Sequence, residues 1–118
     1  MAVANAAMAI QDLRARVDGI AAALVARDGR LLEAALPEGA YAETFSVMCA
    51  TLLGAAVAAN RELDLAAPER IVIDGPGART LLVACGRTLF VVAVVGPGAD
   101  AAAVLREVES VADFLRAN

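Results

Sequence analysis

Few side chains in this 118-residue chain could do chemistry, and they are widely separated. There is no His, which removes the commonest general base and the commonest metal ligand. The two cysteines, Cys49 and Cys85, form no Cys-x-x-Cys pair of the zinc-binding kind. Both stand in strongly apolar segments, so we interpret them as buried free thiols. An exposed thiol stays an alternative for Cys85, which precedes Gly86 and Arg87.

The carboxylates offer no pair suited to general acid and base catalysis. Glu107 and Glu109 are two residues apart in a predicted helix, so they cannot face each other. Glu62 and Asp64 stand at the end of another predicted helix and are typical of a solvated helix end. The sequence therefore predicts a protein that is not an enzyme, with no catalytic residue, no metal site and no cofactor.

Two glycine-rich loops are candidates for binding a phosphate group. Residues 75–80 lack the spacing and the Lys of a phosphate-binding loop and join two strands, so we interpret them as a β-turn. Gly96-Pro97-Gly98 precedes a helix, where an anion could bind, but the carboxylate of Asp100 at the expected N-cap would repel it.

Composition limits the class of protein further. The net charge of −4, the absence of Lys and an aromatic content of 3% argue against nucleic-acid binding, which needs basic patches and stacking platforms.

No segment of the sequence is typical of a membrane span or a signal peptide. The most apolar run, residues 81–95, is interrupted at Gly86 and is too short on either side to cross a membrane. The first ten residues lack the basic region of a signal peptide. We expect one domain over residues 1–118, located in the cytoplasm and not inserted directly in a membrane.

The apolar spacing and the turn residues predict three helices and five strands. The helices are expected over residues 3–17, 41–63 and from Asp100 onward, and the strands over 20–26, 31–36, 70–74, 80–84 and 89–95. Asp28-Gly29 between the first two strands is typical of a type I′ hairpin turn. The order is therefore α-β-β-α-β-β-β-α. A hairpin and a three-stranded meander should join into one five-stranded antiparallel sheet with helices on its faces, an α+β fold.

The helix expected over residues 41–63 is apolar on two opposite faces. Large side chains share one face, which we interpret as the core face: Phe45, Met48, Cys49, Leu52, Ala56, Ala59 and Leu63. Small side chains occupy the other: Val47, Ala50, Gly54 and Ala58, with Thr51 and Arg61 at its margins. A helix on a monomer needs one apolar stripe. Gly54 costs about 1 kcal/mol relative to Ala inside a helix, so a packing reason is expected. We therefore predict a partner on the small face.

The strand over residues 70–74 supports the same interpretation. As the outer strand of the meander it is a sheet edge, and it is short, β-branched and free of Pro, so it invites pairing with another strand. Edge and small face together predict one interface around a two-fold axis. The predicted interface residues are Val47, Ala50, Thr51, Gly54, Ala58, Arg61, Arg70, Ile71, Val72 and Ile73.

These features resemble the Roadblock family, the roadblock-type dynein light chains and their bacterial and archaeal relatives. The resemblance rests on residues 17–32, which are similar to the family's opening hairpin, on the long Ala-rich helix, and on Glu69-Arg70-Ile71-Val72-Ile73 at the start of the meander. It covers nearly the whole chain. It implies a profilin-like sandwich with strand order 2-1-5-4-3, and a homodimer in which the long helices lie side by side and the third strands join two sheets.

The resemblance also implies a function. Family members are regulators and scaffolds, and bacterial ones commonly work beside a small Ras-like GTPase, some as activating proteins and some as docking platforms. No catalytic residue is carried over from the family. We therefore expect a homodimer that binds a Ras-like GTPase. A heterodimer with a paralogue, a small-ligand sensor domain and a structural adaptor in a multiprotein complex stay open as alternatives.

Overall fold

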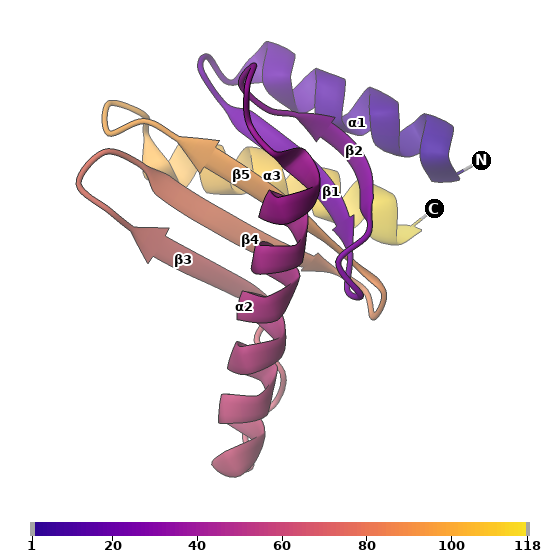
Figure 1. The fold of residues 1–118 in the computed structure, drawn as a ribbon. Coiled ribbons are helices and arrows are strands. Elements are labelled where there is room, and N and C mark those ends of the chain that lie inside the picture. The colour runs from indigo at the N-terminus through magenta and orange to yellow at the C-terminus, as the bar shows by residue number, and fades with distance from the viewer. Residues whose placement is uncertain (1, 118) are drawn as a thin grey trace.

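Helices and strands follow the expected order in the computed structural model, which describes residues 2–117 (Figure 1). The elements are α1 (Ala2–Arg16), β1 (Ala21–Ala26), β2 (Leu31–Ala35), α2 (Ala42–Glu62), β3 (Arg70–Asp74), β4 (Arg79–Cys85), β5 (Leu89–Val95) and α3 (Ala101–Ala117). Every predicted element is present, and each predicted boundary lies within two residues of the observed one.

The strands form a single antiparallel sheet in the order β2-β1-β5-β4-β3. Continuous runs of Leu, Val and Phe place β5 at the centre of the sheet, where both of its faces are covered. The two hairpins meet where β1 pairs with β5, with Ala23 opposite Val92. The edges are β2 and β3. The predicted α+β class and the implied strand order are both confirmed.

The sheet separates two unequal helical layers. On one face α1 and α3 lie side by side, while α2 crosses the other face alone and runs on past the sheet (Figure 1). Among the described residues, 19 buried apolar side chains fill the core beneath α1 and α3, and seven fill the core beneath α2. Ile10, Leu13 and Val108 anchor the first core, and Phe90 and Leu53 anchor the second.

The turn between β1 and β2 differs from the predicted type I′ turn. That turn requires positive φ at both central residues, but within residues 2–117 the non-glycine residue with positive φ is Asp64, not Asp28. Gly29 alone takes the left-handed conformation here, with φ of 97°, and its N–H donates to the Ala26 carbonyl. The Asp28 carboxylate accepts from the Arg30 backbone N–H at 3.0 Å, which stabilises a longer loop.

The last helix begins as its sequence predicts. Asp100 Oδ1 accepts hydrogen bonds from the backbone N–H groups of Ala102 and Ala103 at 3.1 and 3.2 Å, so Asp100 is the N-cap. The sequence also predicts an apolar stripe on this helix, at Val104, Leu105, Val108, Val111, Ala112 and Leu115. All of these side chains are buried except Leu105, which is half-buried. The strong amphipathic pattern left one possible orientation for α3 against the sheet.

Candidate protein-interaction surface

The outer face of α2 exposes large apolar side chains and a glycine. Val47, Met48 and Leu52 are 46%, 57% and 38% exposed. A Cβ atom added at Gly54, two residues after Leu52, would lie in open space, since no atom outside its own helix segment comes within 4 Å of it. The glycine therefore has no packing reason inside this chain. We call this face, residues 47, 48, 51, 52, 54, 55 and 58, the outer face of α2.

The predicted core face of α2 is partly wrong. Phe45 and Cys49 face the sheet as expected and Ala56 is half-buried, but four other side chains assigned to the core are exposed: Met48, Leu52, Ala59 and Leu63. The helix is rotated by about a quarter turn relative to the prediction, so that Leu53 and Val57 complete the contact. Leu53 and Val57 are four residues apart, a spacing that marks one helix face and was overlooked.

A buried polar contact explains this rotation. Ser46 is almost fully buried, and its hydroxyl donates to the carbonyl oxygen of Gly29 at 2.8 Å, with the Glu43 carbonyl oxygen 2.9 Å away as a second acceptor. A Cβ atom at Gly29 would approach Val47 Cγ2 to 3.3 Å, so the turn and the helix are in close contact. A buried serine gives no signal in a count of apolar residues, which is why the sequence did not predict this orientation.

Strand β3 is an open edge of the sheet. It pairs with β4 along its whole length, from Arg70 opposite Val83 to Asp74 opposite Arg79, and with no other strand in the described chain. Val72 and Ile73 are 47% and 40% exposed. The other edge strand, β2, is half-buried, because α1 packs against it. The two edges therefore differ, and β3 is the one available for pairing.

The ten predicted interface residues do not all lie on the surface. Eight are exposed: Val47, Thr51, Gly54, Ala58, Arg61, Arg70, Val72 and Ile73. Ala50 and Ile71 are half-buried and pack against the core beneath α2. Arg70 also forms an ion pair with Glu109 of α3 at 2.8 Å. Ala50 and Ile71 thus serve the core of the chain itself, while the remaining eight stay as candidates for a partner contact.

The two cysteines lie on opposite faces of the sheet and are both buried and free, as predicted. The alternative of an exposed thiol at Cys85 is wrong, since this residue is only 5% exposed. Burial raises the pKa of the Cys85 thiol to about 11 and also raises the pKa of Cys49. Both are therefore protonated thiols at neutral pH and act as small apolar side chains.

A metal site would need several carboxylate or thiol ligands in one place. Across residues 2–117 no group of three or more Cys, Asp or Glu side chains is placed to hold a metal ion. At the Gly96–Gly98 loop, the Asp100 carboxylate already accepts from the first N–H groups of α3. The groups that would have bound an anion there are satisfied within the chain.

Comparison with protein families identifies the domain. Residues 7–94 match the family described as the Roadblock/LC7 domain. The chain belongs to the Roadblock/LC7 family. An uncharacterized protein of Methanocaldococcus jannaschii is 32% identical over 78 residues, which cover 65% of this chain and 66% of that relative, slightly less than two thirds of its length.

Solved structures show the same Roadblock/LC7 fold. The gliding protein MglB from Thermus thermophilus has a TM-score of 0.89 at 18% identity and covers 98% of this chain and 89% of its own. An MglB described as having a tetrameric arrangement has a TM-score of 0.90, also at 18% identity, over 98% of this chain and 88% of its own. Profilin II of Acanthamoeba castellanii has a TM-score of 0.58 at 18% identity over 82% of this chain and 84% of its own, so the implied profilin-like class is confirmed.

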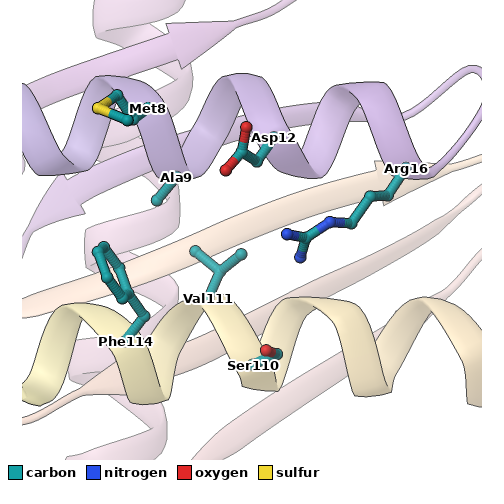
Figure 2. A pocket seen from close by; sticks show the side chains of 7 residues that line it. All are labelled: Met8, Ala9, Asp12, Arg16, Ser110, Val111 and Phe114. Atoms are coloured by element: carbon teal, nitrogen blue, oxygen red, sulfur yellow. The ribbon is translucent and has the colours of Figure 1, made fainter.

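The opposite side of this Roadblock/LC7 domain carries a hollow of about 350 Å³ between α1 and α3 (Figure 2). Side chains from both helices line it: Met8, Ala9, Asp12, Arg16, Ser110, Val111 and Phe114. In Figure 2, Arg16 points from α1 toward α3, and Arg16 pairs with Glu107 at 3.4 Å. The small-ligand sensor domain, one of the alternative functions, would hold its ligand in a pocket against the sheet. This hollow lies between two helices instead, so it does not favour that alternative.

Helix α2 is the one helix in residues 2–117 whose length and composition would suit a membrane span. The mean hydropathy of its most apolar 18-residue segment is 1.5, and 22% of that segment is buried in the folded domain. Its sheet-facing side, however, is fixed to the Roadblock/LC7 core through Cys49 and Leu53 and to the β1–β2 turn through Ser46. We therefore interpret its apolar character as that of a folded helix with one core face and one exposed face.

Proposed function

We propose that this Roadblock/LC7 domain acts as a cytoplasmic, non-enzymatic homodimer that binds and regulates a small Ras-like GTPase. The dimer would form through the outer face of α2 together with the edge of β3. The partner class is supported by the resemblance to bacterial Roadblock proteins that work beside such GTPases. The dispersed polar groups favour regulation or scaffolding over catalysis.

The observation that carries the proposal is the outer face of α2. Exposed Val47, Met48 and Leu52 form an apolar surface on a helix whose other side is already packed. Such surfaces on soluble proteins mark contact sites. A glycine in a helix interior costs about 1 kcal/mol relative to Ala. No close contact within the described chain requires a glycine at position 54. A second helix that approaches closely would use both the apolar surface and the missing side chain.

The sequence of β3 supports pairing between two copies. The strand reads Arg70-Ile71-Val72-Ile73-Asp74. If two such strands pair antiparallel about Val72, Arg70 of each copy stands opposite Asp74 of the other. Opposite charges directly across an antiparallel pair are favourable. The two-fold symmetry of such a pair is the usual symmetry of a homodimer.

Gly54→Arg tests the dimer without threatening the fold. The new side chain meets open space within the chain, and Arg is a better helix former than Gly. We expect the variant to be a monomer with unchanged helical circular dichroism, measured by sedimentation velocity over a range of concentrations. Ala15→Arg on α1 makes a similar change at an exposed helix position on the opposite face and should stay dimeric. A dimeric Gly54→Arg protein would show that α2 is not the dimer contact.

Binding to the GTPase needs a separate experiment. A small Ras-like GTPase encoded beside this chain would be loaded with GDP or with a non-hydrolysable GTP analogue and captured with the wild-type domain. We expect binding in one nucleotide state to exceed binding in the other. No binding in either state would contradict the regulatory function and favour a structural adaptor, even if the protein is a dimer.

A further inference from the structure

A second hollow, of about 410 Å³, opens at the end of the sheet where the β1–β2 turn, the β4–β5 turn and the C-terminal turn of α3 meet. Arginines from all three segments line it: Arg27, Arg87 and Arg116. We propose that this hollow is a binding site for a phosphate group. The inference does not depend on the proposed dimer or on a GTPase partner.

The concentration of positive charge here is unusual for this protein. Three of the ten basic residues line one hollow in a chain whose net charge is −4. Glu69 is the acidic side chain among the lining residues. Like charges brought together repel one another, and an anion in the hollow would offset this repulsion beyond what Glu69 and Asp113, the partner of Arg116, already supply.

Two of the arginines are held in place by backbone carbonyl groups of neighbouring residues. Arg27 Nη2 donates to the Gly86 carbonyl oxygen at 3.1 Å, and Arg116 Nη2 donates to the Ala84 carbonyl oxygen at 2.9 Å. Arg116 Nη1 also donates to Asp113 at 2.7 Å. These contacts fix both guanidinium groups while leaving some of their five N–H donors for a ligand. Groups that are fixed before binding lose little entropy when the ligand arrives.

Arg27 has a polar atom that the rest of the described chain does not satisfy. Its Nε is buried and has no hydrogen-bond acceptor within residues 2–117. A buried N–H of a charged group that has no acceptor costs free energy of folding, and such groups are rare in native proteins. The donors of Arg27 are therefore not all satisfied within the described chain, and the same residue lines the hollow.

The geometry favours phosphate over carboxylate. The three arginines come from different segments, so their donors reach the hollow from several directions. A planar carboxylate is matched by a single guanidinium fork. A tetrahedral phosphate carries more charge and more acceptor oxygens than a carboxylate, so it can accept from several forks at once. The hollow also has space for more than a phosphate ion, so a phosphate ester of a small molecule would fit as well as free phosphate.

Arg87 provides the cleanest test. It is exposed and makes no side-chain hydrogen bond within the described residues, so Arg87→Gln should not disturb the fold. Arg106→Gln on α3 removes the same charge at an exposed position outside the hollow and serves as the matched control. Amide chemical shifts would be followed by NMR during titration with inorganic phosphate, with glycerol 3-phosphate and with acetate, at constant ionic strength.

We expect both phosphate compounds to shift the amide signals of residues 86 and 87 saturably, and Arg87→Gln to weaken phosphate binding by about tenfold, since a charge-assisted hydrogen bond is lost. Tighter binding of glycerol 3-phosphate would identify an ester as the ligand, and equal binding would identify the phosphate group alone. Acetate binding as tight as phosphate binding, no saturable shift, or equal losses in Arg87→Gln and Arg106→Gln would overturn the proposal.

Discussion

The two faces of the sheet are covered unequally, by two helices on one face and by one helix on the other. On one face, α1 and α3 pack side by side over 19 buried apolar residues, and on the other α2 crosses alone over seven. Two helices can shield each other's flanks as well as the sheet. A single helix leaves its own far side exposed, and here that side carries Val47, Met48 and Leu52.

The two sides of the sheet also differ in what they leave exposed. The α1 and α3 side closes its core within the chain, and β2 at its margin is half-buried. The α2 side combines an exposed apolar helix face with the exposed edge β3. The larger core therefore lies on the α1 and α3 side, and the proposed partner contact lies on the other face of the sheet.

The largest expected effect is the loss of a core side chain beneath α1 and α3. Leu13 is fully buried beneath α1, so Leu13→Ala should lower the free energy of unfolding by about 2–5 kcal/mol through lost burial and a cavity. Met48→Ala on the exposed side should change it by less than about 0.5 kcal/mol. Urea unfolding in the Gly54→Arg background measures both without a contribution from dimerisation. A cost for Met48→Ala similar to that for Leu13→Ala would contradict the division of roles.

The two thiols report on the two layers separately. Burial raises the pKa of Cys85 from 9.0 to about 11, which lowers its thiolate fraction at pH 8 about a hundredfold and slows its alkylation. The pKa of Cys49 is raised in the same direction. We expect Cys49, shielded by one helix, to react with iodoacetamide faster than Cys85, and both to react faster in urea. Mass spectrometry of Cys49→Ala and Cys85→Ala would measure the rates. Faster alkylation of Cys85 than of Cys49 in the folded protein would contradict this prediction.

A smaller effect should come from the contact that sets the rotation of α2. Ser46→Ala removes the hydrogen bond to the Gly29 carbonyl, and we expect a loss of about 1 kcal/mol in the free energy of unfolding. Thr44→Ala, at an exposed position of the same helix, is the control and should cost less than about 0.5 kcal/mol. Thermal denaturation of both variants decides whether the buried hydroxyl matters.

An effect of similar size, on the dissociation of the dimer, concerns the edge strand. If two β3 strands pair about Val72, Arg70→Asp or Asp74→Arg alone should weaken the dimer by about 1 kcal/mol, since each change places like charges opposite each other twice. The double exchange should restore much of the affinity. Contacts within one subunit, such as Arg70 with Glu109, are present before and after association and largely cancel in the dissociation constant. Additive losses in the double variant would exclude this register.

The order of elements could be predicted from the sequence because turn residues and apolar runs are local signals. The helix from Ala101 is the clearest example, with its Asp100 cap and a single apolar stripe. The orientation of α2 could not be predicted in the same way. The helix is apolar on more than one face, so Met48 and Leu52 are as plausible in the core as Leu53 and Val57.

Local patterns in the sequence were enough to predict the eight elements, the open edge at residues 70–74 and a second apolar face on the long helix. Which side chains of α2 face the sheet could be known only from the folded chain, because that choice depends on Ser46 reaching the Gly29 carbonyl from another part of the chain. The arginine cluster was likewise invisible in the sequence. Arg27, Arg87 and Arg116 are far apart along the chain and meet only when two turns and a helix end reach the same end of the sheet.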